Sequence, residues 1–157
     1  MPKPKRIVLI EDHPFWEERY VRAFEALKEK ENCVLDESFQ DAKSASEYII
    51  KHHKTLYGVL SDMRIKAGPK QDFHPPLDTA LPYGLWVVKR MADAGIREVP
   101  VVAYSQYFSK GSATRKAVEE ALREYDFLVG AFTTKDDVRA LVKKALAAFE
   151  KFRLGYC

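Results

Sequence analysis

Residues 7–12 read IVLIED, so four consecutive aliphatic residues lead directly into two acids. The aliphatic run has no polar alternation, which predicts a strand that is buried on both faces, as in a parallel sheet. In open α/β sheets, ligands bind beyond the carboxyl ends of the strands. Glu11 and Asp12 stand at that end of the predicted strand. They are therefore the first candidates for a binding site.

Apolar runs of strand length recur four more times, and helical patterns lie between them. Trp16, Tyr20, Phe24 and Leu27, for example, recur at steps of three and four, which favours an amphipathic helix. Strands that alternate with such helices predict right-handed βαβ crossovers and a parallel sheet between two helical layers. We expect an α/β, doubly wound (βα)5 fold with strands at residues 6–10, 33–39, 57–61, 99–105 and 127–132.

Two helix starts carry signals of their own. Pro14 suits the first turn of the first helix, where its missing N–H would have no partner. Asp136 and Asp137 favour the positive N-terminal end of the last helix. His13, beside the acids, is interpreted as an exposed loop histidine and not as a further ligand.

Length and composition predict one domain over residues 1–157, with no output domain. The net charge of +3 arises from mixed acids and bases along the chain, so we expect no nucleic-acid partner. The two cysteines, Cys33 and Cys157, lack metal-site spacing, and no apolar stretch reaches membrane length. We expect a soluble, reduced, cytoplasmic protein without a membrane partner. The basic start, residues 1–6, is interpreted as a frayed terminus.

One connection is much longer than the others. Residues 65–83 contain four prolines, one glycine and no sustained period, which predicts a long loop after the third strand. A surface insertion and a lid or docking loop beside the site are both consistent with this composition.

The third strand repeats the arrangement of the first, because its apolar run leads into Asp62. Three carboxylates that converge at one sheet edge would repel one another and raise their pKa values unless a cation joins them. Mg²⁺ accepts carboxylate and carbonyl oxygens, retains several waters and leaves positions open for a phosphoryl oxygen. The sequence therefore predicts a Mg²⁺ site formed by Glu11, Asp12 and Asp62.

Two more strand ends supply groups that suit phosphate chemistry. The fourth strand ends in Ser105, a hydroxyl donor, and Lys135 follows the fifth strand with a compact positive charge. Metal, hydroxyl and ammonium together can neutralise the charge on a phosphoryl group in transfer, and Asp62 is placed to be the nucleophile. The predicted reaction is phosphoryl transfer to an aspartate.

At these residues the chain resembles the receiver domains of two-component response regulators, including the stand-alone chemotaxis type. The resemblance covers nearly the whole chain and rests on IVLIEDHP, VLSDM, GLWVVKRM, VPVVAYS and GAFTTK, which occur in the expected order. It implies a flavodoxin-like sandwich with a five-stranded parallel sheet of order 2-1-3-4-5.

The same resemblance implies roles for individual residues. Asp62 corresponds to the phosphoacceptor, Ser105 to the switch hydroxyl, Lys135 to the phosphate-sensing lysine and Phe132 to the rotating aromatic switch residue. The metal would be held by Glu11, Asp12, Asp62 and the backbone carbonyl of Arg64. The implied activity is limited to phosphotransfer to Asp62 and its autodephosphorylation.

The implied partners are proteins. A histidine kinase or phosphotransfer protein would donate the phosphoryl group, and a downstream target would dock on the surface formed by the fourth helix, fifth strand and fifth helix. Lys110, Arg115 and Tyr107 are candidates for that surface. A weak homodimer is a further expectation of the resemblance.

Two departures from the family pattern leave an alternative open. Asp136 follows Lys135 where the family usually has a proline, and the 65–83 connection is about a dozen residues longer than usual. The alternative is a phosphorylation-independent receiver that acts as a protein-interaction module. A haloacid-dehalogenase-like phosphatase is disfavoured because Arg64 stands where its general acid would be. A flavin carrier is disfavoured because the acids of the first loop would repel phosphate.

Overall fold

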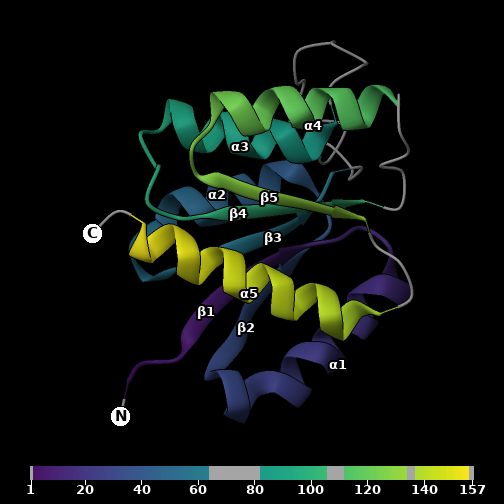
Figure 1. Cartoon of the computed structure of the whole chain (residues 1–157), viewed down its shortest axis with the longest axis vertical. Coiled ribbons are helices and arrows are strands. Elements are labelled where there is room, and N and C mark those ends of the chain that lie inside the picture. The colour runs from purple at the N-terminus through teal and green to yellow at the C-terminus, as the bar shows by residue number, and fades with distance from the viewer. Residues whose placement is uncertain (1, 64–81, 106–111, 134–136, 156–157) are drawn as a thin grey trace.

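The computed structural model describes residues 2–63, 82–105, 112–133 and 137–155. Its strands are β1 (Lys5–Ile10), β2 (Cys33–Phe39), β3 (Gly58–Asp62), β4 (Val101–Ser105) and β5 (Leu128–Thr133). Its helices are α1 (Pro14–Glu31), α2 (Ala42–His52), the short 3-10 turn η1 (His53–Thr55), α3 (Tyr83–Asp93), α4 (Ala113–Glu124) and α5 (Val138–Leu154). All strand pairs are parallel and the order is β2-β1-β3-β4-β5, so the predicted fold and strand order are confirmed (Figure 1).

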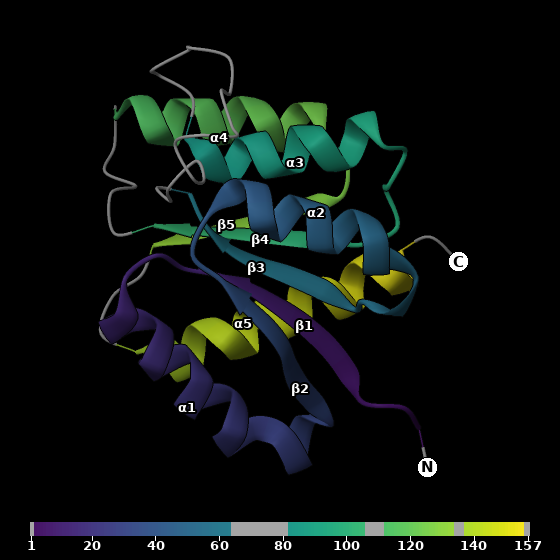
Figure 2. The ribbon, with the colours of Figure 1, turned by 180° about the vertical axis from the view of Figure 1, so that it is seen from behind.

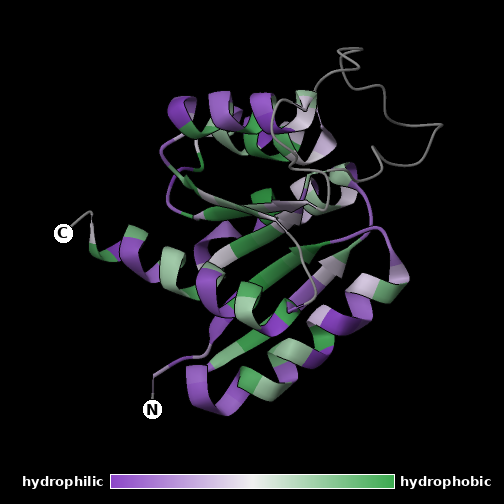
Figure 3. Cartoon of the chain, turned by 45° about the vertical axis from the view of Figure 1, so that its right-hand side comes forward, coloured by the Kyte–Doolittle hydropathy of each residue, from purple (hydrophilic) through white to green (hydrophobic). Residues whose placement is uncertain are grey.

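The sheet lies between two helical layers. Helices α1 and α5 cover one face, while α2, α3 and α4 cover the other, as the view from behind also shows (Figure 2). The middle strands β1, β3 and β4 are buried almost throughout, which explains their unbroken apolar runs. The hydrophobic residues gather along the strands and the inward faces of the helices, with hydrophilic residues outside (Figure 3).

The helix starts follow the predicted signals. Pro14 is the first residue of α1, and Nδ1 of His13 accepts a hydrogen bond of 3.3 Å from the backbone N–H of Phe15. His13 is exposed, as predicted, but it also caps the helix. At α5, the Asp137 carboxylate accepts a hydrogen bond of 3.0 Å from the N–H of Ala140. These side chains satisfy N–H groups that have no partner within the helix.

The interpretation of residues 1–6 as a frayed terminus is wrong for the last two of them. Lys5 and Arg6 belong to β1 and pair with β2. The residues before them run beside the end of α1, where the Asn32 side chain donates to the carbonyl of Lys3 at 3.3 Å. The terminus is thus part of the folded surface, because the sheet ladder begins before the aliphatic run.

The predicted long loop, residues 65–83, lies outside the described residues except for its last two positions, where Pro82 precedes α3 and Tyr83 begins it. Within the described parts of the chain, no helix combines the length and the apolar composition that a membrane crossing requires.

Candidate metal and phosphoryl site

The three predicted acids meet at the carboxyl edge of the sheet. Glu11 and Asp12 directly follow β1, and Asp62 is the last residue of β3. These two strands are neighbours, with Ile10 opposite Ser61, so their ends deliver the acids side by side. One carboxylate oxygen from each acid lies within 4.8 Å of those from the other two. The structure therefore brings together the three side chains that the sequence singled out.

Glu11 is held in place by hydrogen bonds to both of its oxygens. The hydroxyl of Tyr104, on β4, donates to Oε1 at 3.2 Å, and the backbone N–H of His13 donates to Oε2 at 3.1 Å. Glu11 is only 3% exposed, whereas Asp12 and Asp62 are half-buried. The site thus has a buried, oriented carboxylate beneath two that reach toward solvent.

Burial raises the pKa of the Glu11 carboxyl, and the nearby negative charge of Asp12 adds to this effect. Hydrogen bonds with the His13 backbone, the Asp62 side chain and the Tyr104 hydroxyl oppose the shift without cancelling it. A buried acid whose pKa is raised favours protonation when its negative neighbours are not neutralised. A cation at this site would reverse that preference by stabilising the ionised form.

The donor set fits a hard divalent cation. Carboxylate oxygens are the ligands that Mg²⁺ prefers, and this ion is usually held by one or two carboxylates while it keeps several waters. Glu11, Asp12 and Asp62 supply oxygen ligands only, and they converge from two adjacent strand ends. The predicted ligand from the backbone carbonyl of Arg64 lies outside the described residues.

The end of β4 lies beside the predicted phosphoacceptor. Tyr104 pairs with Asp62 across the β3–β4 ladder, and the Tyr104 carbonyl accepts the N–H of Met63 at 3.0 Å. Ser105 follows one residue later and is 1% exposed. Ser105 is therefore close in register to Asp62. On its other side, Ser105 pairs with Thr133 of β5.

Gly84, in the first turn of α3, packs directly against the strand end that carries Asp62. A Cβ at this position would lie 2.6 Å from the Asp62 carbonyl oxygen and 2.8 Å from Cα of Met63. The Gly84 N–H donates to the Met63 carbonyl at 3.1 Å. Only a residue without a side chain allows this close approach of helix and strand. The start of α3 therefore fixes the backbone beneath Asp62.

Phe132 lies on β5 opposite Tyr104 and is half-buried. Its ring packs against the core between the sheet and helices α1 and α5, and Nζ of Lys144 on α5 lies 6.0 Å from the ring centroid. Gly130, two residues earlier on the same strand, leaves room for the ring, since a Cβ there would come within 3.2 Å of it. Phe132 therefore links the sheet to α5 in this structure.

Several predicted residues lie outside the described parts of the chain: Lys135, Tyr107, Lys110 and Asp136. Arg115, the remaining candidate for a docking surface, lies in the first turn of α4. Two residues of the site were not identified from the sequence, namely Tyr104 and Gly84. A tyrosine within a fully buried strand was a usable signal, because a buried phenol requires a hydrogen-bond partner.

Comparison with family models finds no match to this chain. Comparison with curated protein sequences finds none either.

Solved structures do match. A chain in the CheX–CheY–BeF3–Mg²⁺ complex from Borrelia burgdorferi superposes with a TM-score of 0.66 at 13% identity, covering 94% of this chain and 90% of that one. The REC domain of AraT, a response regulator from Geobacillus stearothermophilus, gives 0.65 at 14% identity, covering 98% of both chains. The signal receiver domain of an HD domain-containing protein from Pseudomonas fluorescens Pf-5 gives 0.64 at 14%, covering 96% of this chain and 98% of that one. At these identities the likeness concerns the fold, and this chain has the fold of response-regulator receiver domains.

Proposed function

We propose that this protein is a two-component signalling receiver that accepts a phosphoryl group on Asp62 in a Mg²⁺-dependent reaction. The observation that carries the proposal is the convergence of Glu11, Asp12 and Asp62 within 4.8 Å at the carboxyl edge of a receiver fold. Such an edge is where ligands bind in open α/β sheets, and the acid set suits a hard cation.

In the proposed reaction, one carboxylate oxygen of Asp62 attacks the phosphorus of a phosphohistidine on a histidine kinase or phosphotransfer protein. The phosphorus–nitrogen bond breaks as the oxygen–phosphorus bond forms, and the imidazole leaves with the electron pair and takes up a proton. Glu11, Asp12, Asp62 and the Arg64 carbonyl would hold Mg²⁺, which would supply positive charge to neutralise the phosphoryl oxygens. Ser105 would donate to one of those oxygens and Lys135 would pair with another.

The resulting acyl phosphate would change partner binding. The buried Ser105 and the half-buried Phe132 stand on adjacent strands next to α4 and α5. A shift of Ser105 toward the phosphoryl group would alter the packing beneath the surface of α4, β5 and α5, where we place the downstream protein target.

The test is labelling with a small phosphodonor, such as acetyl phosphate, in the presence and absence of Mg²⁺. Wild-type protein is expected to gain one phosphoryl group, labile to hydroxylamine, only with Mg²⁺. Asp62→Asn should gain none, while Asp93→Asn, on the exposed end of α3, should behave as wild type. Full labelling of Asp62→Asn would show that the nucleophile is assigned wrongly.

A second candidate function is a phosphorylation-independent interaction module. Asp136 after Lys135, in place of the usual proline, is the observation that favours it. Beryllofluoride with Mg²⁺ separates the two candidates, because it mimics the phosphoryl group without chemistry. A Mg²⁺-dependent change in the amide NMR spectrum around Asp62 supports the phosphoacceptor. An unchanged spectrum favours the interaction module.

A further inference from the structure

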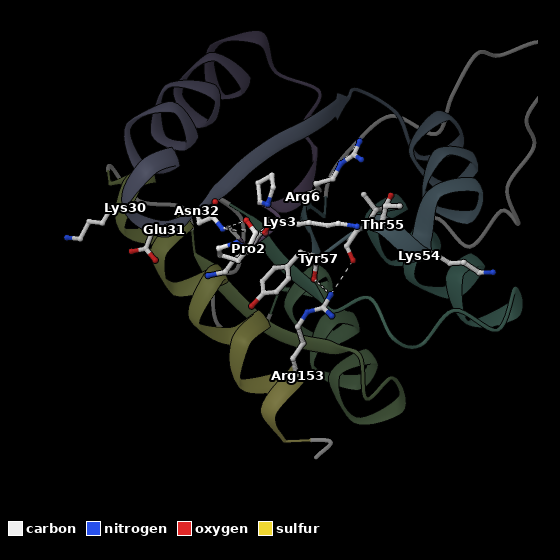
Figure 4. A pocket seen from close by; sticks show the side chains of 13 residues that line it. Pro2, Lys3, Arg6, Lys30, Glu31, Asn32, Lys54, Thr55, Tyr57 and Arg153 are labelled. Atoms are coloured by element: carbon white, nitrogen blue, oxygen red, sulfur yellow. Dashed lines mark hydrogen bonds between the residues drawn. The ribbon is translucent and has the colours of Figure 1, made fainter.

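A broad pocket lies at the opposite edge of the sheet from the acids, where the strands begin. It has a volume of about 610 Å³ and is formed by the start of the chain, the end of α1, the segment before β3 and the end of α5. Figure 4 shows Tyr57 in its middle, with Lys30 and Lys54 extending outward on opposite sides. A volume of this size is typical of sites for small organic ligands.

The lining of this pocket is strongly basic. It includes Lys3, Lys5, Arg6, Lys30, Lys54 and Arg153, against a single acid, Glu31. The lining therefore carries a net charge of +5, whereas the whole chain carries +3, so all other residues together sum to −2. The positive charge of the protein is concentrated at this one edge, which attracts anions.

Most of these cations are not neutralised by acids. Arg6 forms an ion pair with Asp36 of β2. Among the residues that the structure describes, Lys3, Lys5, Lys30 and Lys54 form no ion pair. Lys30 stands in the last turn of α1, where a cation compensates the helix dipole. That explanation does not extend to Lys3 and Lys5, which belong to the start of the chain.

An aromatic ring forms part of the same pocket. Cζ of Arg153 lies 4.3 Å from the centroid of the Tyr57 ring, and Nζ of Lys5 lies 5.5 Å from it. The guanidinium of Arg153 is fixed by donating to the carbonyls of Tyr57 at 2.6 Å and Leu56 at 3.2 Å. The ring packs edge-on against Phe149, which holds its orientation. The pocket thus combines a fixed aromatic and arginine pair with lysines at its rim.

We propose that this pocket binds a nucleotide through its polyphosphate and its base. Lysines from several segments can surround a polyphosphate chain, whose negative charges are close together. The guanidinium of Arg153, which is held over the ring of Tyr57, offers a planar stacking surface for a base. Because the pocket and the acids lie at opposite edges of the sheet, this site is separate from the one proposed for phosphoryl transfer.

The experiment is calorimetric titration with ATP in EDTA, so that no metal at the acid site contributes. Wild-type protein is expected to bind ATP. A variant with Lys3→Gln, Lys5→Gln and Lys54→Gln should bind about tenfold more weakly or worse, because it lacks three of the rim charges. The matched control carries Lys89→Gln, Lys116→Gln and Lys143→Gln, which removes the same charge from exposed positions on α3, α4 and α5 and should change affinity less than about twofold.

Three results would overturn the proposal. Equal weakening in both triple variants would mean diffuse attraction by net charge. Equal affinity for inorganic triphosphate and ATP would mean that the base contributes nothing. Tighter binding of a short single-stranded oligonucleotide than of ATP would assign the surface to nucleic acid. Asp62→Asn should retain ATP binding, so failure at the phosphoryl site and failure here are distinguishable.

Discussion

The hydroxyl of Tyr104 lies 3.2 Å from Oε1 of Glu11 and 3.3 Å from the carbonyl of Ile10, which joins the middle of the sheet to the candidate metal site. The phenol is 2% exposed, so its single proton has only these two acceptors within reach among the described residues. Burial and the charge of Glu11 raise the pKa of Tyr104 well above its usual value. The phenol therefore remains a donor at neutral pH.

Tyr104→Phe should weaken Mg²⁺ binding by removing that donor from Glu11. A lost hydrogen bond of this kind costs about 1 kcal/mol, or roughly a fivefold loss of affinity. Burial already raises the pKa of Glu11, and the substitution should raise it further, so protons would compete with the metal more strongly as the pH falls. Calorimetry at about pH 6 and about pH 8 should show the larger loss at the lower pH.

Tyr125→Phe is the matched control, because it removes a phenol from a half-buried position at the end of α4. Its Mg²⁺ affinity should equal that of wild type. If Tyr104→Phe also binds Mg²⁺ as wild type does at both pH values, the phenol does not position Glu11.

Asp12→Ala should remove a direct metal ligand. Loss of a residue that merely supports a ligand typically costs about ten- to a hundredfold in metal affinity, so loss of the ligand itself should cost at least as much. Calorimetry with Mg²⁺ measures this, and Asp93→Ala, an exposed acid on α3, serves as the control. Unchanged affinity in Asp12→Ala would remove the metal assignment.

Gly84→Ala should disturb the strand end beneath Asp62. The added Cβ would meet the Asp62 carbonyl oxygen at 2.6 Å, and backbone cannot rotate away as a side chain can. Overpacking of this kind typically costs about 1–3 kcal/mol, which urea unfolding would detect. Labelling by acetyl phosphate should slow at the same time, because the nucleophile is displaced.

Gly95→Ala separates this effect from general backbone strain. Gly95 has φ +78° with open space around it, so alanine there should cost about 1–2 kcal/mol without affecting labelling. Equal labelling rates in the two variants would contradict a role for Gly84 in holding Asp62.

Tyr48 should link stability to alkaline pH. Its hydroxyl donates to Asp36 at 2.6 Å, and this hydrogen bond, followed by burial, raises the pKa of Tyr48 to about 12. The folded pKa lies above the unfolded value of about 10, so the protonated phenol stabilises the fold fully below that pH. The contribution should be lost as the pH rises from about 10 to about 12.

The measurement compares urea unfolding of wild type and Tyr48→Phe from neutral pH to about pH 12. The difference in free energy of unfolding between them should be largest near neutral pH and shrink toward about pH 12. Taking the difference removes the contributions of other tyrosines, such as Tyr57, whose pKa is also raised by burial. A difference that stays constant with pH would contradict the Asp36 hydrogen bond.

The strand order and the convergence of acids could be predicted because both depend on short-range patterns. The sequence IVLIED shows a buried strand that ends in acids. Parallel pairing brings the carboxyl ends of such strands to the same edge of the sheet, regardless of the conformation of the connecting loops. Asp62 was expected just beyond its strand and is the last residue of β3. Boundary shifts of this size do not move the acid to another edge.

The contact partners of Tyr104 and Gly84 could not be predicted from the sequence. Each depends on contacts between residues far apart in the sequence: Tyr104 with Glu11, and Gly84 with the end of β3. The segment around Tyr104 indicates a buried phenol that needs an acceptor, but it does not indicate which residue accepts the hydrogen bond. The basic pocket was missed for the same reason, because its cations come from separate segments that only the fold assembles.

The contact of Gly84 with the end of β3 leaves no space between the two backbones. Where two elements touch through side chains, a small movement of one can be absorbed by a change of rotamer. Here the backbone of Gly84 packs directly against the backbone of Asp62 and Met63, and the N–H of Gly84 donates to the Met63 carbonyl. A displacement of the Asp62 backbone would therefore also move the start of α3, which couples the position of this helix to the geometry of the site.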